Sequence, residues 1–443
     1  MPRPFPDVAP GVFFLTLGCP KNEVDSEVMK GAVRSSAFRV AEDADDADIV
    51  VVNTCSFIQE ATEESIAAVL EVIATWLPKR QGRRVIVAGC MPSRYGEDLS
   101  VALPEIDAFV PVADEGTILD VLERLTGVPA RASVDGCALR PDPTRKAEGP
   151  AAYVQISDGC HRSCSYCTIP SIRGPYRSRP LPEILAEVRS LVDQGVREIT
   201  LVGQDISSYG IDLVDGPVAL ADVVRALART EGLAWLRLMY VQPDGVTDEL
   251  LQVMATEPTV CHYLDIPLQH ASAGVLHRMQ RRGSAAEFLR LIGKIRSVLP
   301  DVVLRTSLIA GFPGESRSDV AELERFLLAA RLDYAGVFTY SPEEGTAAAT
   351  SADIPSKATR VRRANRVREL ADHVGCEQAA QRVGCELEVL IEGIDEDGTV
   401  VGRWRGQAPD VDGVVLVDKG ASGDIVRARV VDALGYDLQA EVL

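Results

Sequence analysis

The chain has 443 residues, 46% apolar and 25% charged, which is ordinary for a globular protein and enough for about three domains. No apolar run approaches the ~18 residues of a membrane span, and the proline-rich start, MPRPFPDVAPGVFF, does not resemble a signal peptide, so we expect a soluble cytoplasmic protein. The net charge of −19 argues against a chain built mainly to bind nucleic-acid phosphates.

Residues 11–127 alternate short apolar runs with helical patterns. Three of the runs end in a cysteine, at Cys19, Cys55 and Cys90: GVFFLTLGC, DIVVVNTC and RRVIVAGC. VDSEVMKGAVRS and SFIQEATEESIAAVLEVIATWL have the pattern of helices between them. This alternation predicts a parallel sheet, in which ligands bind at the carboxyl ends of the strands. We therefore expect the three cysteines to converge at one sheet edge.

The second region begins after a stretch rich in proline and charge, residues 128–150, which predicts a linker or a long connecting loop. Six strands are expected: AAYVQIS, EITLVGQD, WLRLMYVQ, YLDIPLQH, VVLRTSLIAG and YAGVFTYS. Five helices are expected between them: PEILAEVRSLVDQG, ALADVVRALART, TDELLQVMATE, SAAEFLRLIGKIRSVL and SRSDVAELERFLLAAR. The fourth helix begins with a capping-box pattern, Ser284 and Glu287, and the first should stop at Gly195.

Six strands joined by right-handed crossovers predict an open, partial version of the β/α barrel. Active sites lie at the carboxyl face of such barrels. Polar residues end several of the strands and should line that face: Gln204, Asp205, Gln242, Gln269, His270, Tyr340 and Ser341.

The last part of the chain changes character. TRVRRANRVREL, residues 359–370, predicts an arginine-rich helix, which we interpret as a solvated connecting helix; a contact with RNA or an acidic surface is the alternative. Residues 377–443 contain short strands broken by Gly and Asp, which predict a small antiparallel β-barrel. That barrel carries 14 acidic and 6 basic residues, a net charge of −8.

Cys160, Cys164 and Cys167 form a C-x3-C-x2-C pattern directly after the first predicted barrel strand. Structural zinc sites and ordinary ferredoxin clusters have four protein ligands, so three thiolates leave a metal position open. An open iron of a 4Fe-4S cluster can chelate S-adenosylmethionine and split it to a 5′-deoxyadenosyl radical. Zinc bound by these cysteines with His161 or a distant cysteine is the alternative, although His161 adjoins Cys160. The other cysteines are interpreted as small hydrophobes or incidental thiols: Cys137, Cys261, Cys376 and Cys385.

These motifs carry a family resemblance over nearly the whole chain. GCHRSCSYCTIP resembles the cysteine loop of radical S-adenosylmethionine (radical SAM) enzymes, and LGCPKNEVDSE, NTCSFI and AGC resemble the N-terminal methylthiotransferase domain. IRGPYRSRP, LVGQDISSYG, YLDIPLQHAS, RMQRRG, LRTSLIAGFPGE and FTYSPEEGT resemble the radical SAM domain, and the final barrel resembles a TRAM domain. The resemblance implies an α/β protein of three domains: residues 11–127, 146–376 and 377–443.

The resemblance to this methylthiotransferase family also implies the chemistry. It implies a second 4Fe-4S cluster on Cys19, Cys55 and Cys90, whose open iron carries the sulfur to be transferred. S-adenosylmethionine serves twice, as the methyl donor to that sulfur and as the source of the radical that abstracts hydrogen from the substrate carbon. Sulfur and electrons must come from outside the chain, and no side chain is assigned as a catalytic acid or base.

Contacts with S-adenosylmethionine are implied at two strand ends and beside the cysteine loop. Gly203, Gln204 and Asp205 should contact its amino end. Gly311 and Gly314, in the turn GFPGE, should lie near its adenine, and Tyr166 should pack beside the cofactor. A Gly/Pro turn and a packed tyrosine are also common in β/α proteins without such contacts. His270 is expected to be a buried core histidine.

The family divides by substrate, between transfer-RNA adenosine and an aspartate of small-subunit ribosomal protein S twelve. GCPKN and YLDIPLQHAS resemble the ribosomal-protein branch, the RimO type, whereas the other branch usually has Gln-Met-Asn after its first Gly-Cys. A tail at −8 would repel phosphate and attract a basic ribosomal protein, and the rest of the chain adds a further −11, the difference between −19 and −8. We therefore expect methylthiolation of the aspartate β-carbon.

Two departures from the family pattern concern substrate fit. Ser56 stands where Gly is common, and AGCMPSRYGED diverges after Cys90, yet neither removes a cysteine. A transfer-RNA methylthiotransferase of the MiaB type is the alternative enzyme. A non-catalytic iron–sulfur protein that binds ribosomes or RNA is the alternative from another class.

Overall fold

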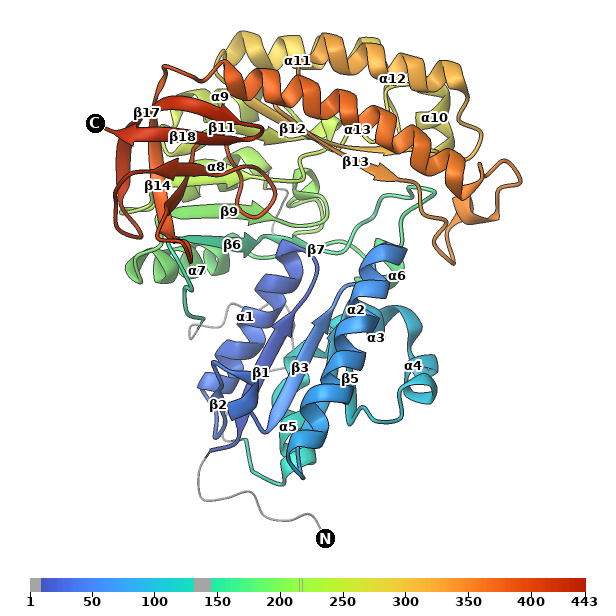
Figure 1. The fold of residues 1–443 in the computed structure, drawn as a ribbon, viewed down its shortest axis with the longest axis vertical. Coiled ribbons are helices and arrows are strands. Elements are labelled where there is room, and N and C mark those ends of the chain that lie inside the picture. Colours follow the sequence, from blue (N-terminus) through green and yellow to red (C-terminus); the bar gives the residue numbers. More distant parts are fainter. Residues whose placement is uncertain (1–8, 131–144, 215, 217) are drawn as a thin grey trace. The chain divides into compact units, whose positions relative to one another are not determined.

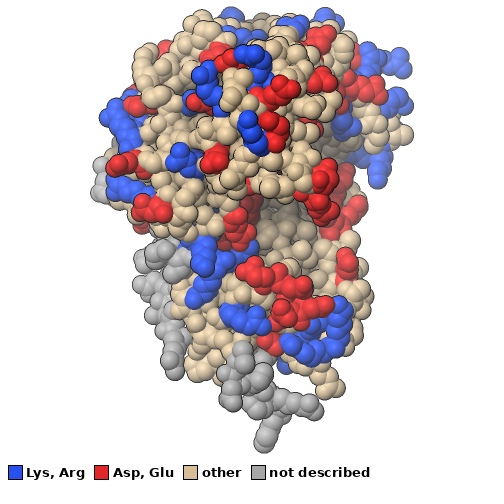
Figure 2. Space-filling model, turned by 60° about the vertical axis from the view of Figure 1, so that its left-hand side comes forward, with Lys and Arg blue, Asp and Glu red and all other residues tan. Residues whose placement is uncertain are grey.

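The computed structural model describes residues 9–130, 145–214, 216 and 218–443. Contacts divide the described residues into two compact units. One comprises those within 1–146, together with 158–162 and 167–187, and the other comprises those within 147–157, 163–166 and 188–443. On the face shown in Figure 2, basic and acidic side chains are interspersed, as is typical of a solvated surface.

The first unit contains a five-stranded parallel sheet in the order β2-β1-β3-β4-β5, shown in Figure 1. Its strands are β1 Gly11–Thr16, β2 Arg39–Val40, β3 Ile49–Thr54, β4 Arg84–Gly89 and β5 Ala108–Pro111. The parallel sheet that the βα alternation predicted is thus confirmed. The sequence pattern missed β2 and β5, because these strands are short and lie at the sheet edges.

Helices accompany this sheet: α1 Pro20–Arg34, α2 Gln59–Glu71, α3 Cys90–Tyr95, α4 Glu97–Ala102, α5 Ile118–Thr126 and α6 Ile169–Ile172. A π-helical turn, η2 Val72–Trp76, extends α2, and shorter helical turns are η1 Ala44–Asp46, η3 Leu77–Lys79 and η4 Val112–Thr117. The first helix begins four residues earlier than expected, because Pro20 suits the first helical position, where no backbone N–H is required.

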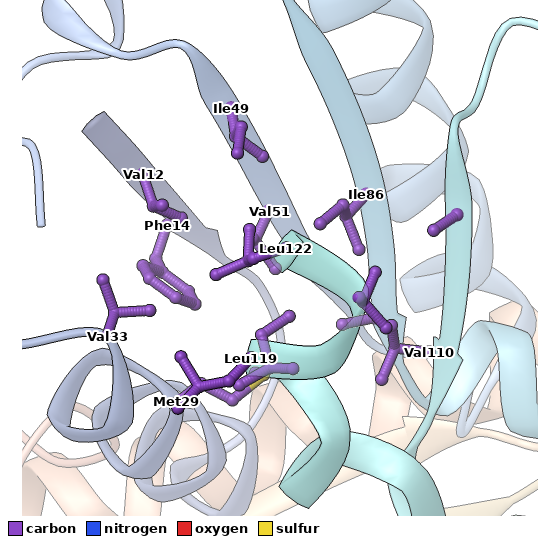
Figure 3. Close-up of a cluster of buried hydrophobic side chains, with 14 of the residues drawn as sticks. Val12, Phe14, Met29, Val33, Ile49, Val51, Ile86, Val110, Leu119 and Leu122 are labelled. Carbon is purple, nitrogen blue, oxygen red and sulfur yellow. The ribbon is translucent and has the colours of Figure 1, made fainter. Parts of the chain in front are cut away.

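Alternate residues of the strands supply two apolar cores. Val12, Phe14, Ile49 and Val51 pack with side chains from α1 and α5 (Figure 3). The intervening strand residues pack on the opposite face with Val69, Trp76 and Met91. Because both faces of the sheet are buried, the strands are nearly continuous apolar runs, as expected for a parallel sheet.

The second unit contains a six-stranded parallel sheet in the order β13-β12-β11-β10-β9-β6. Its strands are β6 Ala151–Gln155, β9 Glu198–Val202, β10 Trp235–Leu238, β11 Val260–Asp265, β12 Val303–Ala310 and β13 Tyr334–Thr339. All six expected strands are present, and the sheet is an open, partial barrel. A separate two-stranded sheet pairs β7 Ser157–Asp158 with β8 Arg177–Ser178.

The helices that follow the strands are α7 Leu181–Asp193, α8 Leu220–Ala228, α9 Asp248–Thr256, α10 Ala273–Arg278, α11 Ala285–Val298, α12 Arg317–Ala330 and α13 Lys357–Ala380. Helical turns are η5 Ile206–Ser208, η6 Pro243–Gly245 and η7 Ala347–Thr350. Among the described residues, no helix is both long and apolar enough to cross a membrane.

Two helix caps differ from the sequence pattern. The Ser284 hydroxyl accepts the backbone N–H of Glu287 as predicted, but the Glu287 carboxylate accepts the Ser284 hydroxyl rather than its backbone N–H. The complete reciprocal capping box lies instead at Ser316 and Asp319, where α12 begins. The predicted box at Ser284 is therefore only half right.

The arginine-rich helix α13 is not simply a solvated connector, which corrects our interpretation. It buries Ala364, Val367, Ala371 and Val374. Arginines along the helix donate to main-chain or carboxylate oxygens of the open barrel: Arg360 to Tyr340 O, Arg363 to Glu315 and Arg368 to Val337 O. Much of its positive charge therefore has a structural role, and the RNA contact stays a prediction.

The C-terminal residues close into a five-stranded barrel in the order β14-β15-β16-β18-β17. The strands are β14 Glu386–Ile394, β15 Val400–Trp404, β16 Val415–Val417, β17 Ile425–Leu434 and β18 Asp437–Val442. Its core is small and aliphatic, with Val389, Ile391, Val415 and Leu438 among the buried residues. The expectation of an all-antiparallel barrel was wrong at one pair, because β16 and β18 run parallel.

The segment 403–412 of this barrel, here called the plug loop, makes buried polar contacts with strands of the six-stranded sheet. Arg403 forms an ion pair with Glu198, the first residue of β9, at 2.8 Å, and Glu198 also pairs with Arg237 of β10 at 2.6 Å. Farther along the loop, Asp412 accepts a hydrogen bond from the Tyr263 hydroxyl at 2.7 Å. These side chains are almost fully buried, so the loop supplies charges that the sheet needs.

Candidate metal and cofactor sites

The first cysteine triad gathers at the carboxyl edge of the five-stranded sheet, as the strand pattern predicted. Cys19 directly precedes α1, Cys55 directly follows β3, and Cys90 follows β4 and begins α3. Strands β1, β3 and β4 are neighbours in the sheet and run parallel, so their carboxyl ends lie side by side. The expected convergence is present, and the role of the three thiols as ligands stays a prediction.

Asn22, on the first turn of α1, sits among these thiols. Its side-chain nitrogen donates to the carbonyl oxygens of Leu17 and Thr54, each at 3.0 Å. These two bonds determine the orientation of the amide and leave Oδ1 facing the cysteines. The sulfur of Cys90 lies 3.6 Å from Oδ1, and that of Cys19 lies 3.9 Å from it.

Cys55 is held from two sides. Its backbone N–H donates to the Ser65 hydroxyl at 3.1 Å, and that hydroxyl donates back to its carbonyl oxygen at 2.8 Å. Gly18, with φ of +100°, packs so closely that a β-carbon there would lie 2.4 Å from the Cys55 β-carbon. The glycine before Cys19 thus lets the loop that carries Cys19 pack against the loop that carries Cys55.

A buried arginine, Arg173, belongs to the same group. Its guanidinium donates to Asn22 Oδ1 at 2.9 Å, to Asp25 at 2.6 Å and to Asp158 at 3.2 Å. Burial raises the pKa of the Cys90 thiol, and the charge of Arg173 acts in the opposite direction. Burial likewise raises the pKa of Cys55.

The second cysteine triad lies on the loop between β7 and α6. The backbone N–H of Cys160 donates to Gly174 O at 3.3 Å, and the N–H of Arg162 points at the Cys160 sulfur, 3.4 Å away. Gly159 has φ of +70°, and a β-carbon there would lie 2.3 Å from Pro175 O. The turn before the first cysteine therefore requires glycine.

Cys164 has a cationic neighbour of its own. The Arg281 guanidinium donates to the Cys164 sulfur at 3.7 Å and also to Gln242 Oε1 at 2.6 Å and Pro267 O at 2.8 Å. The next residue, Ser165, bonds through its backbone N–H to Met279 O at 3.1 Å. These contacts hold the middle of the cysteine loop.

The donor chemistry of both triads suits iron–sulfur clusters. Within the described ranges, no three His, Cys, Asp or Glu side chains surround one point closely enough to ligate a single metal ion. A 4Fe-4S cluster binds each thiolate through a different iron, so its ligands stand farther apart than those of one ion. Each triad therefore provides sulfur donors of the right kind for such a cluster.

The residues after β9 differ in their availability to a ligand. Gln204 has both side-chain amide atoms buried, and neither has a hydrogen-bond partner among the described residues. Asp205 is occupied locally, because its carboxylate accepts from Ser207 and from the Ser208 hydroxyl. Gly203 lies where a β-carbon would be 2.6 Å from the Ser157 hydroxyl. Gln204 is thus the residue of this turn best placed to bind a ligand.

The GFPGE turn after β12 is built from left-handed glycines and held by arginines. Gly311 has φ of +83° and Gly314 has φ of +69°. A β-carbon on Gly311 would lie 2.7 Å from the Cα of Arg360 on α13. Arg278 donates to the carbonyl oxygens of Pro313 and Gly314, at 3.1 and 3.0 Å. These bonds shape the turn, and its contact with adenine stays a prediction.

Aromatic rings connect the cysteine loop to this turn. Tyr166 meets Phe312 edge-on with ring centroids 6.3 Å apart, and Phe312 meets Tyr340 at 5.0 Å. His270 is fully buried, and its Nδ1 accepts the backbone N–H of Ser272 at 2.9 Å. His270 is therefore buried in the core as expected, but it is not fully satisfied, because its Nε2 has no hydrogen-bond partner among the described residues and lies 3.6 Å from a Glu315 oxygen.

The sequence reasoning assigned no role to three of these residues, Asn22, Arg173 and Arg281. They lie in GCPKN, IRGPYRSRP and RMQRRG, so position within a quoted motif was the available signal. Of the cysteines considered incidental, Cys261 is buried, Cys376 is partly exposed and Cys385 is exposed. Cys137 lies outside the described residues.

Protein-family models match three stretches of the chain. The model described as uncharacterized protein family UPF0004 matches residues 11–111. The radical SAM superfamily model matches residues 154–327, and the TRAM domain model matches residues 383–443.

Curated relatives match almost end to end. A ribosomal protein uS12 methylthiotransferase RimO from Geobacter sulfurreducens is 43% identical over 448 residues, covering 98% of each chain. A protein of the same name from Lachnoclostridium phytofermentans is 40% identical over 435 residues, covering 96% of this chain and 98% of the relative.

Solved structures share the fold. The radical S-adenosylmethionine methyltransferase TsrM from Kitasatospora setae has a TM-score of 0.54 at 14% identity, covering 86% of this chain and 81% of TsrM. The cobalamin-dependent S-adenosylmethionine radical enzyme OxsB has a TM-score of 0.51 at 12% identity, covering 82% of this chain and 56% of OxsB. At such identities the likeness concerns the fold alone.

Proposed function

The chain belongs to the family of ribosomal protein uS12 methylthiotransferases, RimO, and we propose that it adds a methylthio group to the β-carbon of an aspartate in uS12. The observation that carries this proposal is the presence of both cysteine triads in a chain at least 40% identical to RimO proteins over nearly its whole length. We also propose the three-domain division at residues 11–127, 146–376 and 377–443.

The two triads are the proposed cluster ligands. Cys160, Cys164 and Cys167 would hold the radical SAM cluster, and the other three, Cys19, Cys55 and Cys90, would hold a second one. When bound, the first cluster supplies an electron that cleaves S-adenosylmethionine, and the second carries the sulfur for transfer. Arg281, which donates to the Cys164 sulfur, places a positive charge beside the first set of thiolates.

The cofactor-binding residues have unequal support. The unpartnered amide of Gln204 supports a hydrogen bond to the polar amino-acid end of S-adenosylmethionine. Gly203, Asp205, Gly311 and Gly314 would act mainly by shaping the two turns around it. Tyr166 would pack beside the cofactor through the ring contact that it makes with Phe312.

The charge of the chain supports a basic protein substrate. The whole chain carries −19, and residues 377–443 carry −8. Ribosomal proteins that bind RNA are basic, so an acidic surface favours encounter with uS12 over encounter with phosphate. An external reductant and an external sulfur source complete the reaction, which we place in the cytoplasm. Because a TRAM domain suggests RNA binding, transfer RNA is retained below as a competing substrate.

The test begins with anaerobic reconstitution and iron analysis. We expect about eight irons per chain, four for each cluster. Cys19→Ala should halve the iron content and abolish methylthiolation while S-adenosylmethionine is still cleaved to 5′-deoxyadenosine. Cys376→Ala is the matched control, because this partly exposed cysteine lies outside both triads, and it should change neither quantity.

Substrate choice is tested by mass spectrometry. Purified uS12, small ribosomal subunits and bulk transfer RNA are incubated separately with the reconstituted enzyme, reductant, sulfide and S-adenosylmethionine. We expect a methylthio group on one aspartate of uS12, free or in the subunit. Methylthiolation of transfer RNA alone would overturn the substrate assignment, and the absence of 5′-deoxyadenosine with every substrate would overturn the enzymatic proposal.

A further inference from the structure

Arg173 places a positive charge beside the N-terminal cysteines from a distant part of the sequence. It lies six residues after Cys167 and more than 80 positions after Cys90, yet it belongs to the same compact unit as the N-terminal sheet. Its side chain is 1% exposed. An arginine this deeply buried is costly to maintain unless each of its hydrogen bonds is made.

The polar partners of Arg173 determine where its charge lies. Asp25 and Asp158 each accept a hydrogen bond from a different terminal nitrogen of Arg173, so the guanidinium plane cannot turn freely. The remaining partner is Asn22 Oδ1, the same atom that lies 3.6 Å from the Cys90 sulfur. Because Asn22 is itself held by two main-chain carbonyls, it cannot rotate to interpose its amino group. Asn22 Oδ1 therefore links the Arg173 guanidinium to the Cys90 thiol.

Arg173 stays charged beside its two carboxylate partners, Asp25 and Asp158. Burial alone would lower the pKa of Arg173, but Asp25 and Asp158 raise it above its usual value, so the guanidinium stays protonated. Each thiolate bound to iron adds negative charge to the site, and Arg173, like the largely buried Lys21, is a cation close enough to act on these cysteines.

We propose that Arg173 is a positioning residue of the N-terminal cluster site, which orients Asn22 and stabilises the reduced, more negative state of the cluster that Cys19, Cys55 and Cys90 hold. The inference rests on the proposed function, because it requires that cluster. Its physical basis is general: net charge and hydrogen bonds near an iron–sulfur cluster set the reduction potential. A buried cation acts strongly because the interior screens it weakly.

The test isolates the N-terminal cluster in the full-length chain. C160A, C164A and C167A are combined so that one cluster remains, and its midpoint potential is measured by redox titration followed by electron paramagnetic resonance. In this background R173Q should lower the midpoint potential by at least ~59 mV for one electron, which corresponds to a tenfold change in the ratio of reduced to oxidised cluster. R173K retains the charge and should stay near the parent value.

Two further variants make the result specific. R145Q is the matched control, because Arg145, like Arg173, is buried between two carboxylates, Glu27 and Glu187, but the charges that act on it are these carboxylates and no cysteine. It should leave the potential unchanged. D158N removes a negative charge from Arg173 and should shift the potential in the positive direction, which keeps the test decisive should R173Q fail to fold.

The outcomes separate this inference from the proposed function. If the parent triple variant binds no iron, the second cluster and the proposed function are wrong. If the parent triple variant binds a cluster but R173Q and D158N have the same midpoint potential as R145Q, the role of Arg173 is refuted while the proposed function stands. Opposite shifts in R173Q and D158N would establish the electrostatic role.

Discussion

Arg403→Met is expected to destabilise the second unit, because it removes one of two cations from a buried carboxylate. The Arg403 side chain is 2% exposed and pairs with Glu198, which is fully buried, at 2.8 Å. The same guanidinium pairs with Glu392 at 2.7 Å and donates to Gln407 O at 2.8 Å. Among the described residues, Arg237 would then be the one cation still paired with Glu198.

The magnitude follows from the burial of the pair. Removing one partner of a buried ion pair costs about 3–5 kcal/mol, and here both carboxylates that Arg403 contacts, Glu198 and Glu392, would lose a cation. For a unit of this size, ~1 kcal/mol lowers the melting temperature by about 2 °C, so a decrease of roughly 6–10 °C is expected. Differential scanning calorimetry or circular dichroism at neutral pH would measure it.

Two controls establish whether burial is the cause. Arg427→Met removes an arginine whose side chain is 70% exposed and should change the melting temperature little, because exposed ion pairs contribute ~0–1 kcal/mol. Glu198→Gln combined with Arg403→Met should be at least as destabilising as Arg403→Met, because the buried Arg237 would then lose its carboxylate partner. A decrease for Arg403→Met no larger than that for Arg427→Met would refute the reasoning.

Three further expectations concern pH and the two turns. Burial alone would raise the pKa of Glu198, but Arg237 and Arg403 lower it below the usual value of about 4.3. The stability that Glu198 provides is therefore present above that pH and is lost as the pH falls through its lowered pKa. Acid unfolding monitored by circular dichroism should show this loss of stability, and the loss should be smaller in Arg403→Met. Gln204→Ala should weaken S-adenosylmethionine binding by up to about tenfold, the loss of one neutral hydrogen bond, as measured by calorimetry; unchanged affinity would remove Gln204 from the site. Gly311→Ala should cost ~1–3 kcal/mol of unfolding free energy because φ is +83°, whereas Gly293→Ala in α11, where a β-carbon meets nothing within 4 Å, should be neutral or stabilising.

Local patterns in the sequence were sufficient for the longer strands and most helices. The six strands of the open barrel are runs of apolar residues between turn signals, and burial on both faces makes such runs visible without any partner. Edge strand β5, only Ala108–Pro111, and helix α3, which begins at Cys90 itself, lack that signal because they are short. The parallel pair β16–β18 was missed because the relative direction of two strands in a barrel depends on the path of the chain between them, which local patterns do not reveal.

The candidate sites show the same limit. The cysteines could be predicted, because their spacing and their position after strands are properties of the chain itself. Arg173 could not, since its partners Asn22 and Asp25 lie about 150 positions earlier and meet it only in the folded unit. The same holds for Arg281 and Cys164, which are 117 residues apart. Contacts between distant segments depend on tertiary packing, which the hydrophobic periodicity of the sequence does not predict.

The plug loop has a consequence for how this protein can be engineered or divided. A fragment that ends before residue 383 would leave Glu198, Arg237, Tyr263 and Arg305 without Arg403 and Asp412, so carboxylate and guanidinium groups would face water inside an opened barrel. The C-terminal barrel is thus a structural subunit of the catalytic fold as well as an appended module. Chimeras that exchange the C-terminal barrel to alter partner choice should keep residues 403–412 of this chain. Only the barrel strands outside this segment should be replaced.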